Sequence, residues 1–600
     1  MDDTKNFLLF IVLSLGLFLA FDTFVWGPQR QAQQPSQPQQ ETDAPADQRT
    51  TSQDQATGGD SMRPQAPASG EAPQAGGAPA GNGATVTTTD ALQSGGRVAI
   101  ETPSLSGSLS LTGGRLDDLT LKNYQVTIKD GAPNVRLLRP RGTADAYFAN
   151  TGWTAPGSGG LNLPDETTVW QADGDRLTPD TPVTLTWDNG QGLTFTRRIE
   201  VDEDFMFTIT QSVRNDSGET VTLAPFALAN RRSKPDTSGF FILHEGAVGV
   251  LDGRLREVGY GKMEDKGRIA HETTGGWLGI TDKYWLVGLV PEQDLPVTAR
   301  FVHSRSGGIP RYQTDFIRPA VSVSPGEQSR VTTRLFAGAK EVDILQRYQN
   351  AYGIKGFDQA VDWGWFYFLT RPVFWLLHHI HALVGNFGVA ILLLTVAVKA
   401  LFYPLANKSY KSMARMKEVQ PKMKELQERY KDDRQRLSQE MMALYQKEKI
   451  NPMAGCLPIL IQIPIFFSLY KVLFVTIEMR HQPGLFWVND LSAPDPARLL
   501  TLFGFVDWDV PGLLQLVNLG VWPLLMGLSM FLTTKLNPQT ATMDDMQKKI
   551  FLALPIFMVF VLNNFPAGLL IYWTWNTVLS GLQQWVIMRR THQQAVRARA

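Results

Sequence analysis

The sequence has one cysteine, Cys456, among 600 residues, which excludes a disulfide framework and any metal site built from several cysteines. Its eight histidines show no HExxH or similar metal-ligand spacing. The phosphate loop GxxxxGKS/T and the dinucleotide fingerprint GxGxxG are both missing from it. We therefore expect no metal, no nucleotide and no other cofactor.

Net charge is also lacking, because 57 basic residues balance 57 acidic ones. Basic and acidic residues are nevertheless unevenly distributed along the chain, as described below. A net charge of zero gives no reason to expect DNA as a partner. The length of the chain predicts two or more domains.

The chain opens with an apolar segment that is uncharged from Asn6 to Phe21, long enough with its flanks to cross about 30 Å of hydrocarbon. The stretch LAFDTFVW that follows offers no small-x-small cleavage site. We interpret residues 1–27 as an uncleaved signal anchor. Residues 28–94 are rich in Pro, Gln, Ala and Gly and are predicted to be a disordered linker.

Short alternating apolar runs separated by Gly, Asn and Asp turns fill residues 95–340, with SLSLTGGRLDDLTL and GWLGITDKYWLVGLV as examples. This pattern is typical of a large all-β domain, a sandwich or a barrel. This region contains two His-Glu dipeptides, His244-Glu245 and His271-Glu272. Adjacent residues of a strand point to opposite faces, so we interpret these side chains as surface residues rather than acid–base couples.

The remainder of the chain reads as a polytopic α-helical membrane region. Residues 361–384 are aromatic-rich and predict an amphipathic helix lying along the membrane surface. Five candidate transmembrane spans follow, and with the signal anchor they make six: about 386–405, 457–476, 513–532, 550–564 and 567–588.

Basic residues predict the orientation of these spans. The loop 406–455 holds twelve Lys or Arg, whereas the loop 480–512 holds two against four aspartates. By the positive-inside rule the first loop and the tail 591–600 face the cytoplasm. Both termini are then cytoplasmic, and the β-domain lies on the outer side.

Within the loop 406–455, apolar positions recur at spacings of three and four, with a break at Asp432-Asp433. These positions are Met416, Val419, Met423, Leu426 and Tyr430 before the break and Leu437, Met441 and Leu444 after it. This pattern predicts a helical hairpin with a coiled-coil-like seam. A solvated hairpin without a partner fits the same pattern as one whose basic face meets anionic lipids or RNA. The basic residues concerned are Lys422, Lys424, Arg429, Arg434 and Arg436.

Lys399 is the one charged residue in the apolar run GVAILLLTVAVKALFYPL. Inserting a charged side chain at the bilayer centre costs roughly 2.5–3.5 kcal/mol. Thr395, Lys399 and Tyr403 are spaced by four and predict one polar stripe of a helix. Gln462, Gln583 and Gln584 bring polar groups to related depths in other spans, which favours a hydrated cavity in the inner leaflet. Alternatively, Lys399 snorkels to the headgroups.

The motifs TVAVKALFYPL, QPKMKELQERYKDDRQRLSQEMMALYQKEKINPMAGCLPILIQIPIFFSLY and FPAGLLIYW resemble the YidC membrane protein insertase family of Gram-negative bacteria. The resemblance is strongest from about residue 362 to 590. It implies an insertase and chaperone of the inner membrane, without covalent catalysis, that helps nascent membrane proteins enter the bilayer alone or with the Sec translocon. It also implies a periplasmic β-supersandwich related to carbohydrate-binding folds.

The resemblance extends to single positions. The family's intramembrane cation is usually arginine and corresponds to Lys399, its threonine one turn earlier corresponds to Thr395, and a tyrosine of the last span corresponds to Trp573. Client helices are expected on apolar surfaces of the spans, and the ribosome is a candidate partner of the basic loop and tail. The candidate client contacts are Ile463, Phe466, Phe557, Tyr572 and Trp573.

Three other classes remain open from the residues. A secondary transporter also places charges in mid-membrane, although no inverted repeat is visible in the five spans. A membrane-anchored carbohydrate-active protein would depend on the β-domain. A pure scaffold would tolerate the loss of Lys399.

Overall fold

The computed structural model describes residues 85–599 except 157–159, 238–242, 365, 432, 449–456, 507, 509, 516 and 538–544. The predicted signal anchor and most of the predicted linker lie outside the described residues. Contacts divide the described chain into two compact units, one holding residues 418–451 and the other holding the rest. Each unit is described by itself below.

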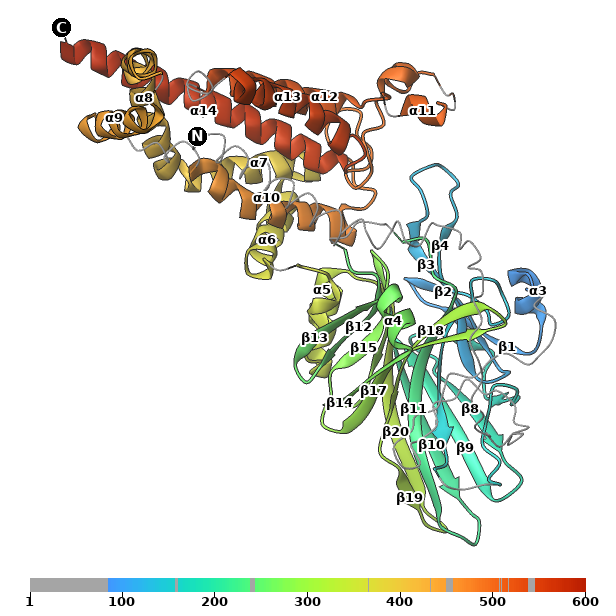
Figure 1. Cartoon of the computed structure of the whole chain (residues 1–600). Helices are drawn as coiled ribbons and strands as arrows, with labels where there is room; N and C mark the ends of the chain where they lie inside the picture. The colour runs from blue at the N-terminus through green and yellow to red at the C-terminus, as the bar shows by residue number, and fades with distance from the viewer. Residues whose placement is uncertain are drawn as a thin grey trace, which may run out of the picture. The chain divides into compact units, whose positions relative to one another are not determined.

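The β-domain spans Arg97 to Ala339 and consists, in the described residues, of twenty strands in two sheets (Figure 1). The eleven-stranded sheet runs β14 (Arg268–Thr274), β17 (Pro296–Ser306), β18 (Ile309–Ile317), β11 (Val221–Arg232), β5 (Tyr147–Thr154), β3 (Arg115–Gln125), β2 (Leu105–Ser110), β1 (Arg97–Glu101) and β7 (Arg176–Leu177), with β19 (Val321–Val323) on β11 and β4 (Asn134–Leu138) on β3. The nine-stranded sheet runs β13 (Arg254–Gly259), β12 (Gly246–Leu251), β15 (Trp277–Thr281), β16 (Trp285–Val290), β20 (Gln328–Ala339), β10 (Met206–Asn215), β9 (Leu193–Val201), β8 (Val183–Asp188) and β6 (Gln171–Ala172). The predicted all-β class is confirmed.

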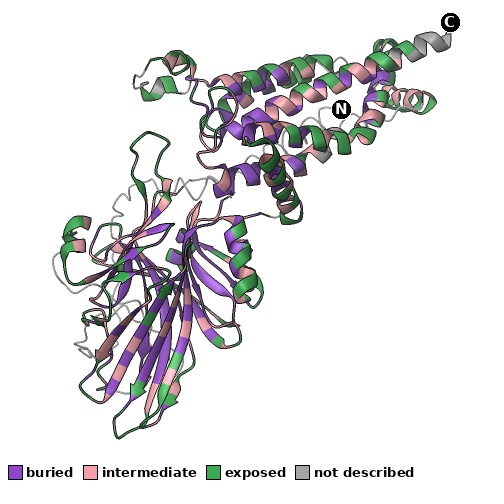
Figure 2. Ribbon diagram, turned by 180° about the vertical axis from the view of Figure 1, so that it is seen from behind, coloured by how far each residue is buried: buried purple, intermediate pink, exposed green. Residues whose placement is uncertain are grey.

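Alternation of apolar and polar side chains explains these strands. In β9 the apolar positions Leu193, Phe195, Ile199 and Val201 are buried, and Arg197 on the same face is buried with them. The residues that alternate with this face are partly or fully exposed. Successive side chains of a strand point to opposite faces, so this pattern gives the strand one core face. Figure 2 shows the buried residues running along the strands of both sheets.

Short helices accompany the sheets: α3 (Thr88–Gln93), α4 (Tyr260–Lys266), α5 (Val342–Tyr352) and the 3-10 helix η2 (Phe357–Ala360). Helix α3 lies inside the stretch predicted to be disordered, so that prediction is wrong at its C-terminal end. The Thr87 side chain accepts a hydrogen bond from the Asp90 backbone N–H, which caps α3, and Ala91 is buried. A local cap therefore orders a segment whose overall composition predicts disorder.

The C-terminal part of the chain is helical. It comprises α6 (Tyr367–Val384), α7 (Phe387–Leu401), α8 (Tyr403–Arg429), α9 (Arg434–Lys447), α10 (Leu457–Val475), η4 (Ile477–Met479), η5 (Leu499–Gly504), α11 (Gly512–Gln515), α12 (Val521–Leu536), α13 (Asp545–Leu562) and α14 (Ala567–Arg599). In the described residues no single helix has both the length and the apolar character of a membrane span, but the bent pair α7 and α8 passes that test together.

The observed helices differ in their bounds from the predicted spans. Helix α13 begins at Asp545 and ends at Leu562 where 550–564 is predicted, and α14 continues to Arg599 beyond the predicted end at 588. Two further differences have a local explanation. The span predicted from residue 513 begins at Val521, because residues 512–515 form the separate helix α11. The span predicted as 386–405 ends at Leu401, and α8 leaves at 68° to α7. Pro404 explains this break at Phe402, since it has no backbone N–H to donate to the Ala400 carbonyl one turn earlier.

The helical hairpin has the predicted break. Helix α8 ends at Arg429, and α9 begins at Arg434 after Asp433, whose side chain accepts from the Arg436 backbone N–H. Lys422 of α8 donates to Glu448, just beyond α9, at 2.8 Å. Three of the predicted seam positions, Met416, Val419 and Met423, are buried.

Candidate functional site

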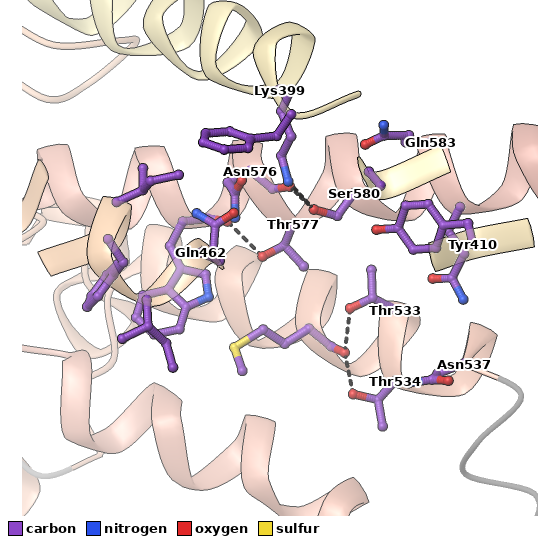
Figure 3. Close-up of a pocket in the computed structure, with 18 of the residues that line it drawn as sticks. Lys399, Tyr410, Gln462, Thr533, Thr534, Asn537, Asn576, Thr577, Ser580 and Gln583 are labelled. Carbon is purple, nitrogen blue, oxygen red and sulfur yellow. Dashed lines mark hydrogen bonds between the residues drawn. The ribbon is translucent and has the colours of Figure 1, made fainter. Parts of the chain in front are cut away.

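A cavity of about 600 Å³ lies among α7, α8, α10, α12, α13 and α14. Figure 3 shows the polar side chains that converge on it from these helices. Its polar lining residues are Lys399, Tyr410, Gln462, Thr533, Thr534, Asn537, Tyr572, Asn576, Thr577, Ser580, Gln583 and Gln584. The remaining lining is apolar or aromatic, with Phe402, Ile463, Phe466 and Trp573 among it.

Lys399 is the cation of this lining. Its Nζ donates to Ser580 Oγ of α14 at 2.6 Å, and Ser580 in turn donates to the Asn576 carbonyl at 2.7 Å (Figure 3). An ammonium group has three N–H donors, so this contact uses one of them. The described residues that line the cavity include no carboxylate, and the charge of Lys399 is therefore not neutralised by the lining.

Hydroxyl groups on α12 and α14 are accommodated in apolar helices by bonding back to their own helix. Thr533 and Thr534 donate to the Met530 carbonyl at 2.9 and 2.8 Å, and Thr577 donates to the Trp573 carbonyl at 2.8 Å. A hydroxyl that donates in this way keeps lone pairs free to accept. These residues give the cavity a polar wall without adding charge.

Two amide side chains tie helices together at the cavity. Gln462 of α10 donates to the Tyr572 hydroxyl of α14 at 2.5 Å. Gln584 of α14 donates to the Leu536 carbonyl at the end of α12 at 3.3 Å. Both amides are therefore held in position by neighbouring helices.

Four of the six residues predicted for the groove lie in this cavity: Lys399, Gln462, Gln583 and Gln584. The other two do not line it. Thr395 is buried, and its hydroxyl donates to the Ile391 carbonyl at 2.7 Å. Tyr403 is 44% exposed and starts α8 beyond the break at Phe402, so the predicted stripe ends at Lys399.

The candidate client contacts divide in the same way. Ile463, Phe466, Tyr572 and Trp573 line the cavity, and the rings of Phe466 and Trp573 meet edge to face at 4.6 Å. Phe557 of α13 is not among the lining residues and is 59% exposed.

The basic residues of the hairpin are not among the residues that line the cavity. Lys422, Lys424, Arg429 and Arg436 are exposed, and the side chain of Arg434 lies outside the described residues. Arg436 lies 3.6 Å from Asp433 and Lys422 contacts Glu448, whereas Lys424 and Arg429 have no described salt bridge.

Sequence reasoning missed most of the hydroxyl and amide wall: Thr533, Thr534, Asn537, Asn576, Thr577 and Ser580. A signal for three positions was present, because Asn576, Ser580 and Gln584 recur at intervals of four and share one helix face. Searching each apolar helix for such a stripe would have found the partner of Lys399.

Two family models match the sequence of this chain. The family described as YidC periplasmic domain matches residues 97–376, and the family described as 60Kd inner membrane protein matches residues 379–594.

Two curated relatives are similar to this chain over nearly its whole length. The membrane protein insertase YidC of Beijerinckia indica is 48% identical, with 98% of this chain and 96% of that protein covered. The membrane protein insertase YidC of Methylorubrum extorquens is also 48% identical, again over 98% and 96% of the two chains. A crystal structure of an active YidC insertase with its first transmembrane domain resolved covers 82% of this chain and 92% of its own, at 16% identity and a TM-score of 0.34. The chain, with its β-rich periplasmic domain and helical C-terminal region, belongs to the YidC family of membrane protein insertases.

Proposed function

We propose that this protein inserts apolar segments of nascent inner-membrane proteins through the cavity around Lys399. The observation that carries the proposal is the cation of Lys399, which borders a cavity of about 600 Å³ whose described lining offers hydroxyl and amide groups but no carboxylate. Water in this cavity solvates the ammonium group. A polar or acidic client segment that enters the cavity has less hydrocarbon left to cross.

The client's apolar helix moves along the lipid-facing side meanwhile, past Ile463 and Phe466 of α10 and Phe557 of α13. Burial in lipid drives this step, because each buried CH₂ contributes about 0.8 kcal/mol. The membrane potential assists an acidic segment moving outward by about 2.3 kcal/mol per charge per 100 mV. The cycle needs no nucleotide and no covalent intermediate.

The proposed topology has six spans: a signal anchor in residues 1–27 and five spans formed by α7, α10, α12, α13 and α14. The basic loop 406–455 and both termini lie in the cytoplasm, and residues 95–340 lie in the periplasm. Charge asymmetry supports this orientation, since twelve basic residues in one loop contrast with two in the loop 480–512. Helix α6 lies along the outer membrane surface.

The proposed partners follow from charge and family. Exposed Lys424 and Arg429 of the hairpin attract anionic lipid headgroups or the ribosome, and the tail 591–600 adds further basic residues. The family resemblance adds the Sec translocon as a proposed partner, so that the protein inserts clients alone or together with it.

Substitution of Lys399 tests the proposal in vesicles that contain each variant and a panel of clients differing only in outer-segment charge. Lys399→Arg should retain insertion because it keeps the cation. Lys399→Ala should slow acidic clients by about 10- to 100-fold, the equivalent of a charge-assisted hydrogen bond, and neutral clients much less. Equal rates for all clients with Lys399→Ala would contradict the proposal.

A further inference from the structure

The loop between α10 and α12 exposes large apolar side chains that no role assigned above uses. Its 3-10 helix η5 has no buried residue, and Leu502 and Phe503 within it are 58 and 53% exposed. Phe505, just after η5, is 89% exposed, and Phe486, earlier in the loop, is 82% exposed. The sequence LLTLFGFV from residue 499 to 506 carries no charge. Clustered apolar exposure of this kind marks a surface that contacts a protein or a membrane.

Three of these exposed apolar residues hold left-handed backbone geometry. The angle φ is 58° at Phe486, 46° at Leu502 and 62° at Phe503. This geometry costs a residue other than glycine about 1–3 kcal/mol and persists only where the surrounding structure imposes it. The outward position of these side chains is therefore fixed by the rest of the loop.

Asp495 supplies much of that constraint from the base of the loop, where it is buried. Its Oδ1 accepts from the Trp487 indole N–H at 2.9 Å and from the Ala497 backbone N–H at 3.0 Å. Its Oδ2 accepts from the backbone N–H of Trp522, in the first turn of α12, at 2.6 Å. The loop is thus tied to the end of α12, and Figure 1 shows α11, which belongs to this loop, beyond that end.

The backbone of the exposed segment forms hydrogen bonds within the loop. The Phe503 N–H donates to the Arg498 carbonyl at 2.8 Å, and the Val506 N–H donates to the Thr501 carbonyl at 3.1 Å. The guanidinium of Arg498, which flanks the segment, donates to Asn564 Oδ1 at 3.3 Å at the start of the next connection. Water would satisfy a solvated loop without such bonds, whereas an unpaired backbone group in hydrocarbon costs several kcal/mol.

We propose that residues 499–506 insert into the outer leaflet of the membrane, with Leu502, Phe503 and Phe505 among the acyl chains next to the headgroups. The inference rests on the topology proposed above, in which α10 and α12 span the membrane and this loop joins their outer ends. Phospholipid fits the segment better than a protein partner does, because the segment is uncharged and its backbone donors are already paired. Helix α12, which continues from the loop, is also apolar and exposed at Leu525 and Leu528. The inserted segment fixes the depth at which α12 ends.

Site-directed fluorescence in vesicles tests the depth of the segment. Full-length protein with Cys456→Ser carries one new cysteine, at Phe505→Cys or at Leu502→Cys, labelled with an environment-sensitive fluorophore. It is reconstituted without a client into vesicles of phosphatidylethanolamine and phosphatidylglycerol. Iodide on both sides of the membrane should quench these labels at least about fivefold less than a label at Val169→Cys, which is 64% exposed in the β-domain. Lipids with a spin-label quencher near the headgroup should quench them more than lipids with the quencher at the middle of the acyl chain.

Leu528→Cys, near the middle of α12 and 55% exposed, separates this inference from the proposed topology. In a spanning α12 this label is quenched most by the mid-chain lipid. Iodide quenching at position 505 equal to that at 169, with lipid quenching retained at 528, would overturn the insertion of the loop and leave the topology intact. Strong iodide quenching at 528 as well would remove the topology and the inference together.

Protection of position 505 from both iodide and lipid quenchers would also contradict the proposal, because a second protein surface would then cover the segment. Client insertion is not measured in these vesicles, so a failure of the mechanism around Lys399 leaves the outcome unchanged. Agreement between the labels at 502 and 505 decides the question even if one of the two variants fails to fold.

Discussion

Ser580 is the residue that most directly positions the Lys399 side chain, because it accepts from Nζ at 2.6 Å. Ser580→Ala leaves the cation in place and removes this acceptor, which water in the cavity replaces. We expect insertion of acidic clients to fall by less than about tenfold, below the loss with Lys399→Ala. Thr577→Val is the matched control, since among the described residues the Thr577 hydroxyl hydrogen-bonds to the Trp573 carbonyl and not to Lys399. A loss with Ser580→Ala as large as that with Lys399→Ala would mean that position, rather than charge, limits insertion.

Glu478, in the 3-10 helix η4 beyond α10, predicts a pH dependence of stability. Its Oε1 accepts from the Val342 backbone N–H at 2.9 Å, and burial raises the pKa of this carboxyl to about 7. Between pH 4.5 and 7 the folded protein keeps a proton that the unfolded chain has lost. The free energy of unfolding therefore falls as pH rises through this window, by about 3 kcal/mol at most, and is level above pH 7.

Glu478→Gln retains an acceptor for Val342 and has no proton to lose. Unfolding midpoints measured from pH 5 to pH 8 should therefore vary less for Glu478→Gln than for the unmodified protein. Glu203→Gln, at an exposed position of the β-domain, should leave the pH profile unchanged. The same slope in Glu478→Gln as in the unmodified protein would assign the pH dependence to other groups.

At the residue scale, a polar side chain was predictable where its surroundings were uniformly apolar. Lys399 and Gln462 stand out in this way, and the cavity contains both. Thr395 was misleading because a threonine can satisfy its hydroxyl on its own helix, as its bond to the Ile391 carbonyl shows. Thr577 and Ser580 also donate to carbonyls of their own helix, so the sequence did not indicate that they line a cavity. Their role depends on which helix faces them.

The break between α7 and α8 is the feature of element scale that shapes the cavity. The two helices meet at 68°, and the lining continues past the break through Phe402, Leu405 and Tyr410. Helical periodicity alone carried the predicted stripe on to Tyr403. A single proline outweighs such periodicity, because proline in a helix interior costs about 3 kcal/mol.

Pro404→Ala restores the missing N–H and lets α7 continue into α8. We expect the bend to straighten, so that spin labels at positions 393 and 411 move apart in pulsed EPR, and insertion to decrease because the α8 residues leave the cavity wall. Pro421→Ala makes the same chemical change within α8 and should alter neither the distance nor insertion. An unchanged distance in Pro404→Ala would show that packing, and not the proline, sets the bend.

At the scale of the whole molecule, the domain classes were predictable but the sheet order was not. Alternation identified strands one by one, yet β11 lies between β5 and β18, which are far from it in the sequence. Such long-range pairing depends on how two complete sheets pack, and local patterns do not contain that information.

The separate cavity of the helical region predicts that insertion survives loss of the β-domain. All the residues that line this cavity come from α7 onward, and none lies in residues 95–335. Deleting those residues should therefore leave insertion within about threefold of the unmodified rate in vesicles, a change below about 0.7 kcal/mol in barrier height. Equal membrane levels of the two proteins, checked by immunoblot, are the necessary control. A carbohydrate-active protein would lose its activity with this deletion, so abolished insertion at normal levels would move the functional centre to the β-domain.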